Sequence, residues 1–295
     1  MTGGGGVTAK LTQEAVGGLS AGVVGTVIGF PLDTVKARQQ ILGSEGVVST
    51  AGRIVRNEGA LSLYRGIVPP LLSLSILNTL NFTSYSYFQT AYGARRGWDA
   101  RNALAGATVG PLASSVSTVE NLIKTQLQLD NVTAKRYKGS LDCLRQLVRE
   151  DGLRVLYTGH VVNTARETAF LLTYFGTYEG LREALFHYHG QDHPLMIPAA
   201  GGLAGAIAWA ASFPLDCVRA GVQGQNLSSQ GGRPTKRGAY QVFAGLMKTR
   251  GVRGLYSGVM PSIIRAFLVS GSRFTAYESA LWLLRGGRDV GIESG

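Results

Sequence analysis

Residues 31–40 read PLDTVKARQQ, and this stretch has two counterparts further along the chain. Residues 214–223 read PLDCVRAGVQ, and residues 119–128 read VENLIKTQLQ. In all three signature stretches a basic residue stands five positions after the first residue, and a glutamine stands nine positions after it. Because matches at fixed offsets indicate one structural unit repeated in tandem, we expect a chain built from three repeats.

The matching offsets extend well beyond the signature stretches. Glycines stand 13 and nine residues before the start of each stretch, which gives every repeat a GxxxG pattern. Small residues at this spacing allow neighbouring helices to approach closely. Downstream, each repeat has a Tyr-x-Gly sequence, and a tyrosine stands 19 residues after that glycine. The matched residues are Gly18, Gly106 and Gly201; Gly22, Gly110 and Gly205; Gly66, Gly159 and Gly258; and Tyr85, Tyr178 and Tyr277.

Six long segments are mostly apolar, in a chain with 45% hydrophobic and 16% charged residues. A helix that crosses a bilayer needs about 20 such residues. Small and hydroxylated residues recur along the segments at helical spacing, which is typical of a bundle around a water-filled cavity. The segments are residues 15–32, 67–94, 102–119, 161–178, 194–215 and 259–277. We therefore predict an all-α membrane protein with six transmembrane helices in three tandem repeats and pseudo-threefold symmetry.

Each repeat also predicts a short amphipathic helix between its two transmembrane helices, at residues 47–57, 140–150 and 240–250. The expected organisation is an N-terminal tail at residues 1–10, repeats at 11–95, 96–188 and 189–285, and a C-terminal tail at 286–295. An even number of transmembrane helices places both termini on one side of the membrane.

Other classes of protein fit the sequence less well. The net charge of +11 is compatible with a basic nucleic-acid-binding protein, which predicts solubility without detergent. The basic residues, however, lie mostly in the polar connections, a distribution that anionic lipid explains better. No Ser-His-Asp or Cys-His constellation indicates an enzyme. The cysteine and histidine spacing indicates no metal site, and we expect no cofactor apart from bound lipid.

The signature stretches resemble the mitochondrial carrier family. The family signature is Pro-x-acid-x-x-base, followed by acid-Gly-x4-aromatic-base-Gly, and PLDTVKARQQ is followed by Glu58-Gly59 and Tyr64-Arg65-Gly66. The resemblance covers about residues 11–285. It implies a monomeric solute transporter of the mitochondrial inner membrane, with the short helices on the matrix side and both termini toward the intermembrane space. It also implies cardiolipin at the repeat junctions, at Gly66, Gly159 and Gly258.

The signature stretches predict a matrix gate. Proline kinks a helix, and an acid and a base three residues apart share a helix face, so each helix end offers charges inward. The family pattern then implies the interhelical pairs Asp33–Lys124, Asp216–Lys36 and Asn121–Arg219. Asn121 replaces the acid of the third pair, and the adjacent Glu120 lies about 100° around the helix, so we do not expect it to replace that acid fully. Braces beneath the gate are expected at Gln40, Gln128 and Gln223.

The resemblance also implies a cytoplasmic gate of the form aromatic-acid-x-x-base. Its residues are Ser86, Gln89, Glu179, Arg182 and Glu278, with Leu281 where the third base belongs. The pairs implied by position are Ser86–Arg182, Glu179–Leu281 and Glu278–Gln89, so none is a complete ion pair. We therefore expect the conformer that is closed toward the matrix to predominate.

Charged residues at the membrane midplane are costly and indicate function. Arg166 and Arg265 each stand seven residues after a Tyr-x-Gly glycine, and Glu167 follows Arg166. This arrangement is similar to the amino acid and carnitine carriers, most of all to plant mitochondrial basic amino acid carriers. We expect Arg265 to bind a substrate carboxylate and Glu167 to bind a substrate cation. Alternatively, Arg166 and Glu167 neutralise only each other.

Leu77 and Asn78 complete the expected substrate site. Ornithine-type carriers have an acid where this chain has Leu77, and an apolar wall there also fits an acylcarnitine. The leading prediction is an arginine and ornithine class transporter, by exchange or uniport. The alternatives are a carnitine/acylcarnitine carrier and, since both gates are incomplete, a passive channel or proton-leak protein. Arg273, a further cation in the last segment, has no predicted role.

Overall fold

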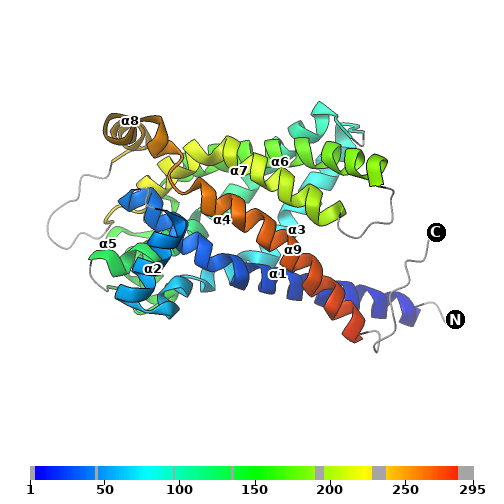
Figure 1. Ribbon diagram of the computed structural model, residues 1–295, viewed down its shortest axis with the longest axis horizontal. Coiled ribbons are helices and arrows are strands. Elements are labelled where there is room, and N and C mark those ends of the chain that lie inside the picture. Colours follow the sequence, from blue (N-terminus) through cyan, green and yellow to red (C-terminus); the bar gives the residue numbers. More distant parts are fainter. Residues whose placement is uncertain are drawn as a thin grey trace.

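The computed structural model describes residues 4–43, 46–95, 97–133, 136–189, 196–227 and 237–284, and over these residues it contains helices and no strand. These residues form six long helices and three short ones, which are labelled in Figure 1. The long helices are α1 (Gly4–Leu42), α3 (Val68–Ala91), α4 (Ala100–Thr133), α6 (His160–His189), α7 (Met196–Gln223) and α9 (Val259–Leu284). The short helices are α2 (Val47–Glu58), α5 (Ser140–Asp151) and α8 (Ala239–Leu255), and the 3-10 turns η1 (Ala60–Tyr64) and η2 (Leu153–Tyr157) follow α2 and α5.

The long helices form a closed ring. Each packs against the next in the order α1, α3, α4, α6, α7, α9, and α9 packs against α1. Figure 1 shows the long helices running along the length of the molecule, with α2, α5 and α8 at one end. The start of α1 and the end of α9 lie at the opposite end. The ring therefore has one end that carries the short helices and another that carries the first and last turns of the described bundle.

The short helices lie where the sequence predicts them, and every long helix except α3 continues beyond the end of its apolar segment. Helix α1 ends at Leu42, α4 at Thr133 and α7 at Gln223, so all three signature stretches are helical. Helix α1 begins at Gly4 and so includes most of the segment that the sequence analysis assigns to a tail. The expected C-terminal tail lies outside the described residues.

The glycines of the three Tyr-x-Gly sequences make a cyclic set of contacts. Their φ angles are positive, at 87°, 77° and 88°, which is a conformation that favours glycine. A Cβ atom would lie 3.2 Å from the Lys124 carbonyl oxygen at Gly66, 3.3 Å from Gln223 Cγ at Gly159 and 3.1 Å from the Lys36 carbonyl oxygen at Gly258. The Tyr-x-Gly turn of each repeat therefore packs against the signature stretch of the next repeat, and the turn of repeat three packs against the stretch of repeat one.

The GxxxG patterns do not behave alike. In α4, a Cβ atom on Gly110 would lie 2.6 Å from the Cα atom of Thr168, so α4 and α6 are in backbone contact there. In α7, a Cβ atom on Gly205 would lie 3.4 Å from the Ala266 side chain, which is ordinary contact. The expectation of close helix approach thus holds for α4, whereas α7 leaves room for a side chain.

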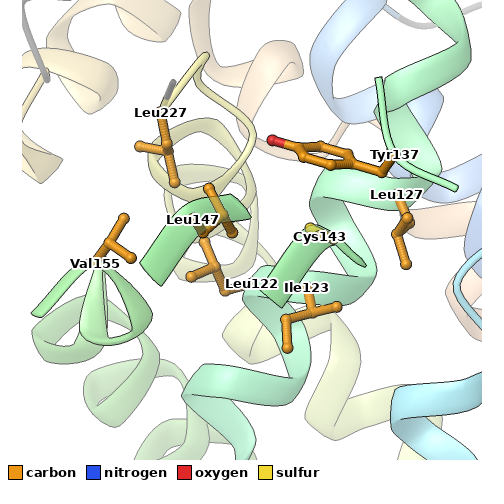
Figure 2. Packing of buried hydrophobic residues seen from close by; sticks show 8 residues of the cluster. All are labelled: Leu122, Ile123, Leu127, Tyr137, Cys143, Leu147, Val155 and Leu227. Atoms are coloured by element: carbon orange, nitrogen blue, oxygen red, sulfur yellow. The ribbon is translucent and has the colours of Figure 1, made fainter. Parts of the chain in front are cut away.

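A buried apolar cluster holds α5 against the bundle (Figure 2). Leu122, Ile123 and Leu127 of α4 contact Cys143 and Leu147 of α5 in this cluster. The remaining members are Tyr137, Val155 and Leu227. Burial of this apolar surface stabilises the end of the ring next to the signature stretch of α4.

Helix length and hydropathy alone single out only part of the ring. Within the described residues, two helical segments are long and apolar enough to cross a membrane, Ala60–Ala91 and Met196–Gln223. The other long helices carry polar or charged residues along their length. Many of those residues lie inside the ring, where they form the site described next.

Candidate functional site

A cavity of ≈ 190 Å³ lies inside the ring, beside the signature stretches. Its lining comes from all six long helices and combines charges of both signs with few apolar groups. The lining residues are Asp33, Lys36, Ala37, Gln40, Leu77, Ser117, Glu120, Asn121, Lys124, Thr125, Gln128, Arg166, Glu167, Trp209, Arg219, Ala220 and Arg265. Most residues expected in the matrix gate and in the substrate site therefore share one cavity.

Two of the three expected matrix-gate pairs are present as contacts. The Nζ atom of Lys36 on α1 lies 2.7 Å from Oδ2 of Asp216 on α7. The Nζ atom of Lys124 on α4 lies 2.6 Å from Oδ2 of Asp33 on α1. Asp33 and Lys36 stand three residues apart on one face of α1, so the acid pairs with α4 and the base pairs with α7. Both pairs thus join different repeats.

The third expected pair, Asn121 with Arg219, is not formed. Arg219 donates to Oδ1 of Asp216 at 2.9 Å and to Oε1 of Gln223 at 2.8 Å, both on its own helix. Asn121 has no charge to compete with Asp216, and its amide donates to Asn163 at 3.5 Å. This expectation was therefore wrong, because a nearby carboxylate on the same helix binds the guanidinium.

Neutral hydrogen bonds join α4 and α7 where the third ion pair is missing. The Gln126 amide donates to the backbone carbonyl of Gln223 at 2.6 Å and to that of Gln225 at 2.9 Å. The Gln223 amide donates to the carbonyl oxygen of Thr118 at 3.3 Å. The contact between α4 and α7 is therefore polar but not ionic in the described side chains.

The expected braces differ in their contacts. The Gln40 amide donates to Oδ2 of Asp216 at 2.7 Å and so contacts the Lys36–Asp216 pair. The Gln128 amide donates to Thr34 at 3.2 Å instead of to the Asp33–Lys124 pair. Gln223 accepts from Arg219, as described above. Two of the three glutamines thus contact charged gate residues.

The expected substrate residues are already engaged in ion pairs. Arg166 Nη1 lies 2.6 Å from Oε1 of Glu167, and Arg166 Nε lies 3.5 Å from Oδ1 of Asp216. Arg265 Nε lies 2.7 Å from Oδ1 of Asp33. Glu167 is therefore paired with Arg166 in this conformation, although Arg166 does not pair with Glu167 alone, because it also contacts Asp216. Each arginine also contacts an acid of the matrix gate.

Trp209 of α7 is a cavity residue that the sequence analysis missed. The Nζ atom of Lys36 lies 3.8 Å from the centroid of its ring, and Cζ of Arg166 lies 4.8 Å from the same centroid. Cations are attracted to an aromatic face. The ring therefore helps to hold two cations that also contact Asp216. The sequence signal was a large aromatic residue among small ones, five residues before Pro214.

Of the two substrate-site residues expected on α3, one lines the cavity. Leu77 lines the cavity, but Asn78 is absent from the described lining. Glu120 of α4, which the sequence analysis noted only as a neighbour of Asn121, lines the cavity and accepts a hydrogen bond from Ser73 of α3. The signal for Glu120 was an acid within a largely apolar stretch.

At the other end of the ring, the expected cytoplasmic-gate residues are not joined by ion pairs between helices in the described side chains. Glu179 and Arg182 lie 3.9 Å apart, both on α6. The Gln89 amide donates to Asn102 at 3.0 Å and to Tyr85 at 3.2 Å, while the side chain of Ser86 is exposed. The side chains of Glu278 and Leu281 lie outside the described residues.

Arg273 of α9 packs against α1. A Cβ atom on Gly25 would lie 2.7 Å from Cγ of Arg273, so the glycine makes space for the arginine. Its Nε atom is buried and has no hydrogen-bond partner among the described residues. The structure gives this cation a position but no counter-charge in the described part of the chain. Those residues also contain no group of three His, Cys, Asp or Glu side chains that could hold a metal ion.

Comparison with known proteins places this geometry in context. Residues 7–96, 98–189 and 191–287 each match the family described as Mitochondrial carrier protein. The chain is similar to the mitochondrial basic amino acids transporter of Rattus norvegicus, with 32% identity over 95% of this chain and 92% of that protein. It is similar to the mitochondrial arginine transporter BAC2 of Arabidopsis thaliana, with 33% identity over 91% of this chain and 90% of that protein. It is also similar to the mitochondrial substrate carrier family protein S of Dictyostelium discoideum, with 29% identity over 94% of this chain and 99% of that protein.

Proposed function

Because the chain belongs to the mitochondrial carrier family, we propose that it transports basic amino acids of the arginine and ornithine class across the mitochondrial inner membrane. Family membership confirms the predicted resemblance and the predicted location. The relatives named as basic amino acid and arginine transporters support the substrate class, and they match this chain over nearly its whole length. The function is therefore transport and not enzymatic catalysis.

One observation carries the proposal: each acid of the matrix gate is shared with an arginine of the substrate site. Asp33 contacts both Lys124 of the gate and Arg265 of the site, at 2.6 Å and 2.7 Å. Asp216 contacts both Lys36 and Arg166, at 2.7 Å and 3.5 Å. A substrate carboxylate that binds these arginines must compete with the gate acids. Substrate binding and gate opening are thus coupled through the same charges, as alternating access requires.

The arginines are suited to a substrate carboxylate. A guanidinium group offers a planar set of donors that binds a carboxylate through two parallel hydrogen bonds. Arg265 and Arg166 come from α9 and α6, on different sides of the cavity lining. A free amino acid enters the cavity with its carboxylate toward these groups, and its positive charges then face the cavity acids.

We further propose that all six long helices cross the membrane with pseudo-threefold symmetry. The cyclic glycine contacts, which run from repeat one to two, two to three and three to one, support this arrangement. Low hydropathy in α1, α4, α6 and α9 is compatible with it, because their polar groups line the shared cavity or pair with one another. In this arrangement the first turn of α1 and the last turn of α9 face the intermembrane space, and α2, α5 and α8 face the matrix.

The ring closes within one chain, which supports a monomeric transporter. All the cavity residues come from this chain, so no second copy is needed to complete the site. We also propose cardiolipin at the turns of Gly66, Gly159 and Gly258, where a helix begins and its first N–H groups favour an anionic headgroup. Native mass spectrometry of protein extracted in mild detergent tests both points together.

Uptake into proteoliposomes tests the proposed function. The purified protein is expected to show saturable uptake of radiolabelled arginine, with ornithine as an effective competitor. Liposomes with and without internal arginine distinguish exchange from uniport. Arg265→Ala is the matched control and is expected to lower the affinity roughly ten- to a hundredfold, because it removes a charge-assisted hydrogen bond. Stronger competition by carnitine esters indicates the acylcarnitine alternative, for which Leu77 supplies an apolar wall, and non-saturable flux indicates a channel.

A further inference from the structure

Glu120 is the one acid among the described cavity residues without an ion pair. Asp33 contacts two cations and Glu167 contacts Arg166. Glu120 accepts a hydrogen bond through Oε2 from the Ser73 hydroxyl, and the described residues offer it no ion pair. Lys124 stands one turn further along α4, but its Nζ atom lies 2.6 Å from Asp33. Because an uncompensated charge inside a helix ring is costly, Glu120 is the acid in this cavity that gains most from a cation brought in by a substrate.

The position of Glu120 complements the apolar side of the cavity. Ser73, which holds Glu120, and Leu77, which lines the cavity, stand one turn apart on α3. Leu77 reaches the cavity from α3, and Glu120 reaches it from α4. The cavity thus places an apolar group and a carboxylate next to each other. This combination fits a methylene chain that ends in a positive charge.

We propose that Glu120 binds the side-chain cation of a basic amino acid, while Arg265 binds its carboxylate. This inference rests on the proposed function and identifies the residue that selects for a second positive charge. Glu167, the acid that the sequence favours for this role, is neutralised by Arg166 at 2.6 Å. The Ser73 hydroxyl fixes one oxygen of Glu120 and leaves the other for an ammonium or guanidinium group.

The experiment compares arginine with citrulline, which has the same length but a neutral side chain. Competition against labelled arginine in proteoliposomes gives the apparent affinity for each compound. In Glu120→Gln the affinity for arginine is expected to fall roughly ten- to a hundredfold, whereas the affinity for citrulline changes little, because only arginine loses a charged partner. Glu120→Asp keeps the charge and is expected to retain most of the preference for arginine.

A second-site variant tests the same point independently. Since Leu77 and Glu120 line the same cavity, Leu77→Glu in the Glu120→Gln background is expected to restore the preference for arginine. Ser73→Ala is expected to reduce that preference by a smaller factor, because it frees the carboxylate to rotate, and it covers the case in which Glu120→Gln fails to fold.

Two outcomes overturn the inference. Equal loss of affinity for arginine and citrulline in Glu120→Gln shows that Glu120 only maintains the structure. An unchanged preference in Glu120→Gln, or in Ser73→Ala where Glu120→Gln does not insert, shows that another group binds the cation. Neither outcome is confused with failure of the proposed function, because in that case the unaltered protein takes up no basic amino acid at all.

Discussion

Asp216 is a single carboxylate that contacts several charged residues of the gate and of the substrate site. It is fully buried and contacts Lys36, Arg219 and Arg166, and it also accepts a hydrogen bond from Gln40. Burial of these charges costs solvation energy, and the carboxylate offsets that cost only while every partner is present. Asp216 therefore belongs to the gate and to the substrate site at once.

Replacement of this carboxylate is expected to destabilise the protein strongly. Asp216→Asn leaves three cations around a neutral amide, and loss of one partner from a buried ionic group costs about 3–5 kcal/mol. Thermal unfolding in detergent measures the effect. Asp142→Asn is the control, because this carboxylate on α5 accepts hydrogen bonds from the Lys138 backbone and Gln146 that an amide oxygen also accepts. Equal unfolding temperatures for the two variants contradict the central role of Asp216.

The two native cysteines are expected to resist thiol reagents. Cys143 is fully buried on α5, and burial raises the pKa of its thiol to about 12. Because the pKa is raised, the thiol is protonated at neutral pH, and only the thiolate reacts readily. Cys217 is 3% exposed. Mass spectrometry after treatment with N-ethylmaleimide is expected to find both unmodified in folded protein and modified after denaturation, whereas rapid labelling of folded protein argues against this packing.

The gate pairs could be predicted from positions that match between repeats, and Glu167 from its place beside Arg166, but the roles of Glu120 and Trp209 could not. The offsets predicted the pairs of Asp33 and Asp216, because each signature stretch supplies the same positions. Glu120 corresponds to Leu32 and Leu215, and Trp209 corresponds to Thr26 and Ser114. A comparison of repeats gives no reason to expect a function at such positions. The tertiary structure shows their role because it brings α3, α4 and α7 to one cavity.

At the scale of the helices, apolar periodicity predicted the elements but not their ends. The expected segments stop near the first charges, whereas α1, α4 and α7 continue through the signature stretches. Charged residues end an apolar run in the sequence, but here they pair with neighbouring helices and so remain compatible with a buried helix. Likewise, the GxxxG pattern predicted that neighbouring helices approach closely in each repeat. The actual distance between the helices depends on the residues that face each glycine, which the pattern does not specify.

The contrast between α4 and α7 gives a prediction about helix packing. Gly110→Ala places a methyl group 2.6 Å from the Cα atom of Thr168, so α4 and α6 must move apart. Gly205→Ala places its methyl group 3.4 Å from Ala266, where no rearrangement is needed. Overpacking typically costs about 1–3 kcal/mol. Gly110→Ala is therefore expected to lower the unfolding temperature clearly and Gly205→Ala hardly, and the reverse order contradicts the close approach of α4 to α6.

For the whole molecule, the ring is symmetric in architecture but uneven in charge. Of the three expected matrix-gate pairs, those between α1 and α4 and between α1 and α7 are ionic, whereas α4 and α7 are joined by amide hydrogen bonds. At the opposite end, the described side chains of the expected cytoplasmic gate form no ion pair between helices. We therefore still expect the conformer that is closed toward the matrix to predominate.

The substitution Asn121→Asp restores the charge that is missing from the third gate pair. Asn121 and Arg219 both line the cavity, and Arg219 binds Asp216 because position 121 offers no acid. Asn121→Asp is expected to recruit Arg219 and to form the third ionic link, between α4 and α7. Since a partly exposed ion pair contributes up to about 1 kcal/mol, the closed conformer should gain roughly a few-fold in population. Turnover should slow, because that link must break before the cavity opens toward the matrix.

Cysteine accessibility measures this shift directly. A single cysteine at position 77, which lines the cavity, is labelled with a membrane-impermeant thiol reagent applied from either side of oriented proteoliposomes. Asn121→Asp is expected to reduce labelling from the matrix side, whereas the matched variant Asn121→Leu, which is similar in size but uncharged, should not. If Asn121→Asp leaves matrix-side labelling unchanged or increases it, Arg219 does not pair across the ring. The amide hydrogen bonds of Gln126 and Gln223 would then be the contacts that hold α4 against α7.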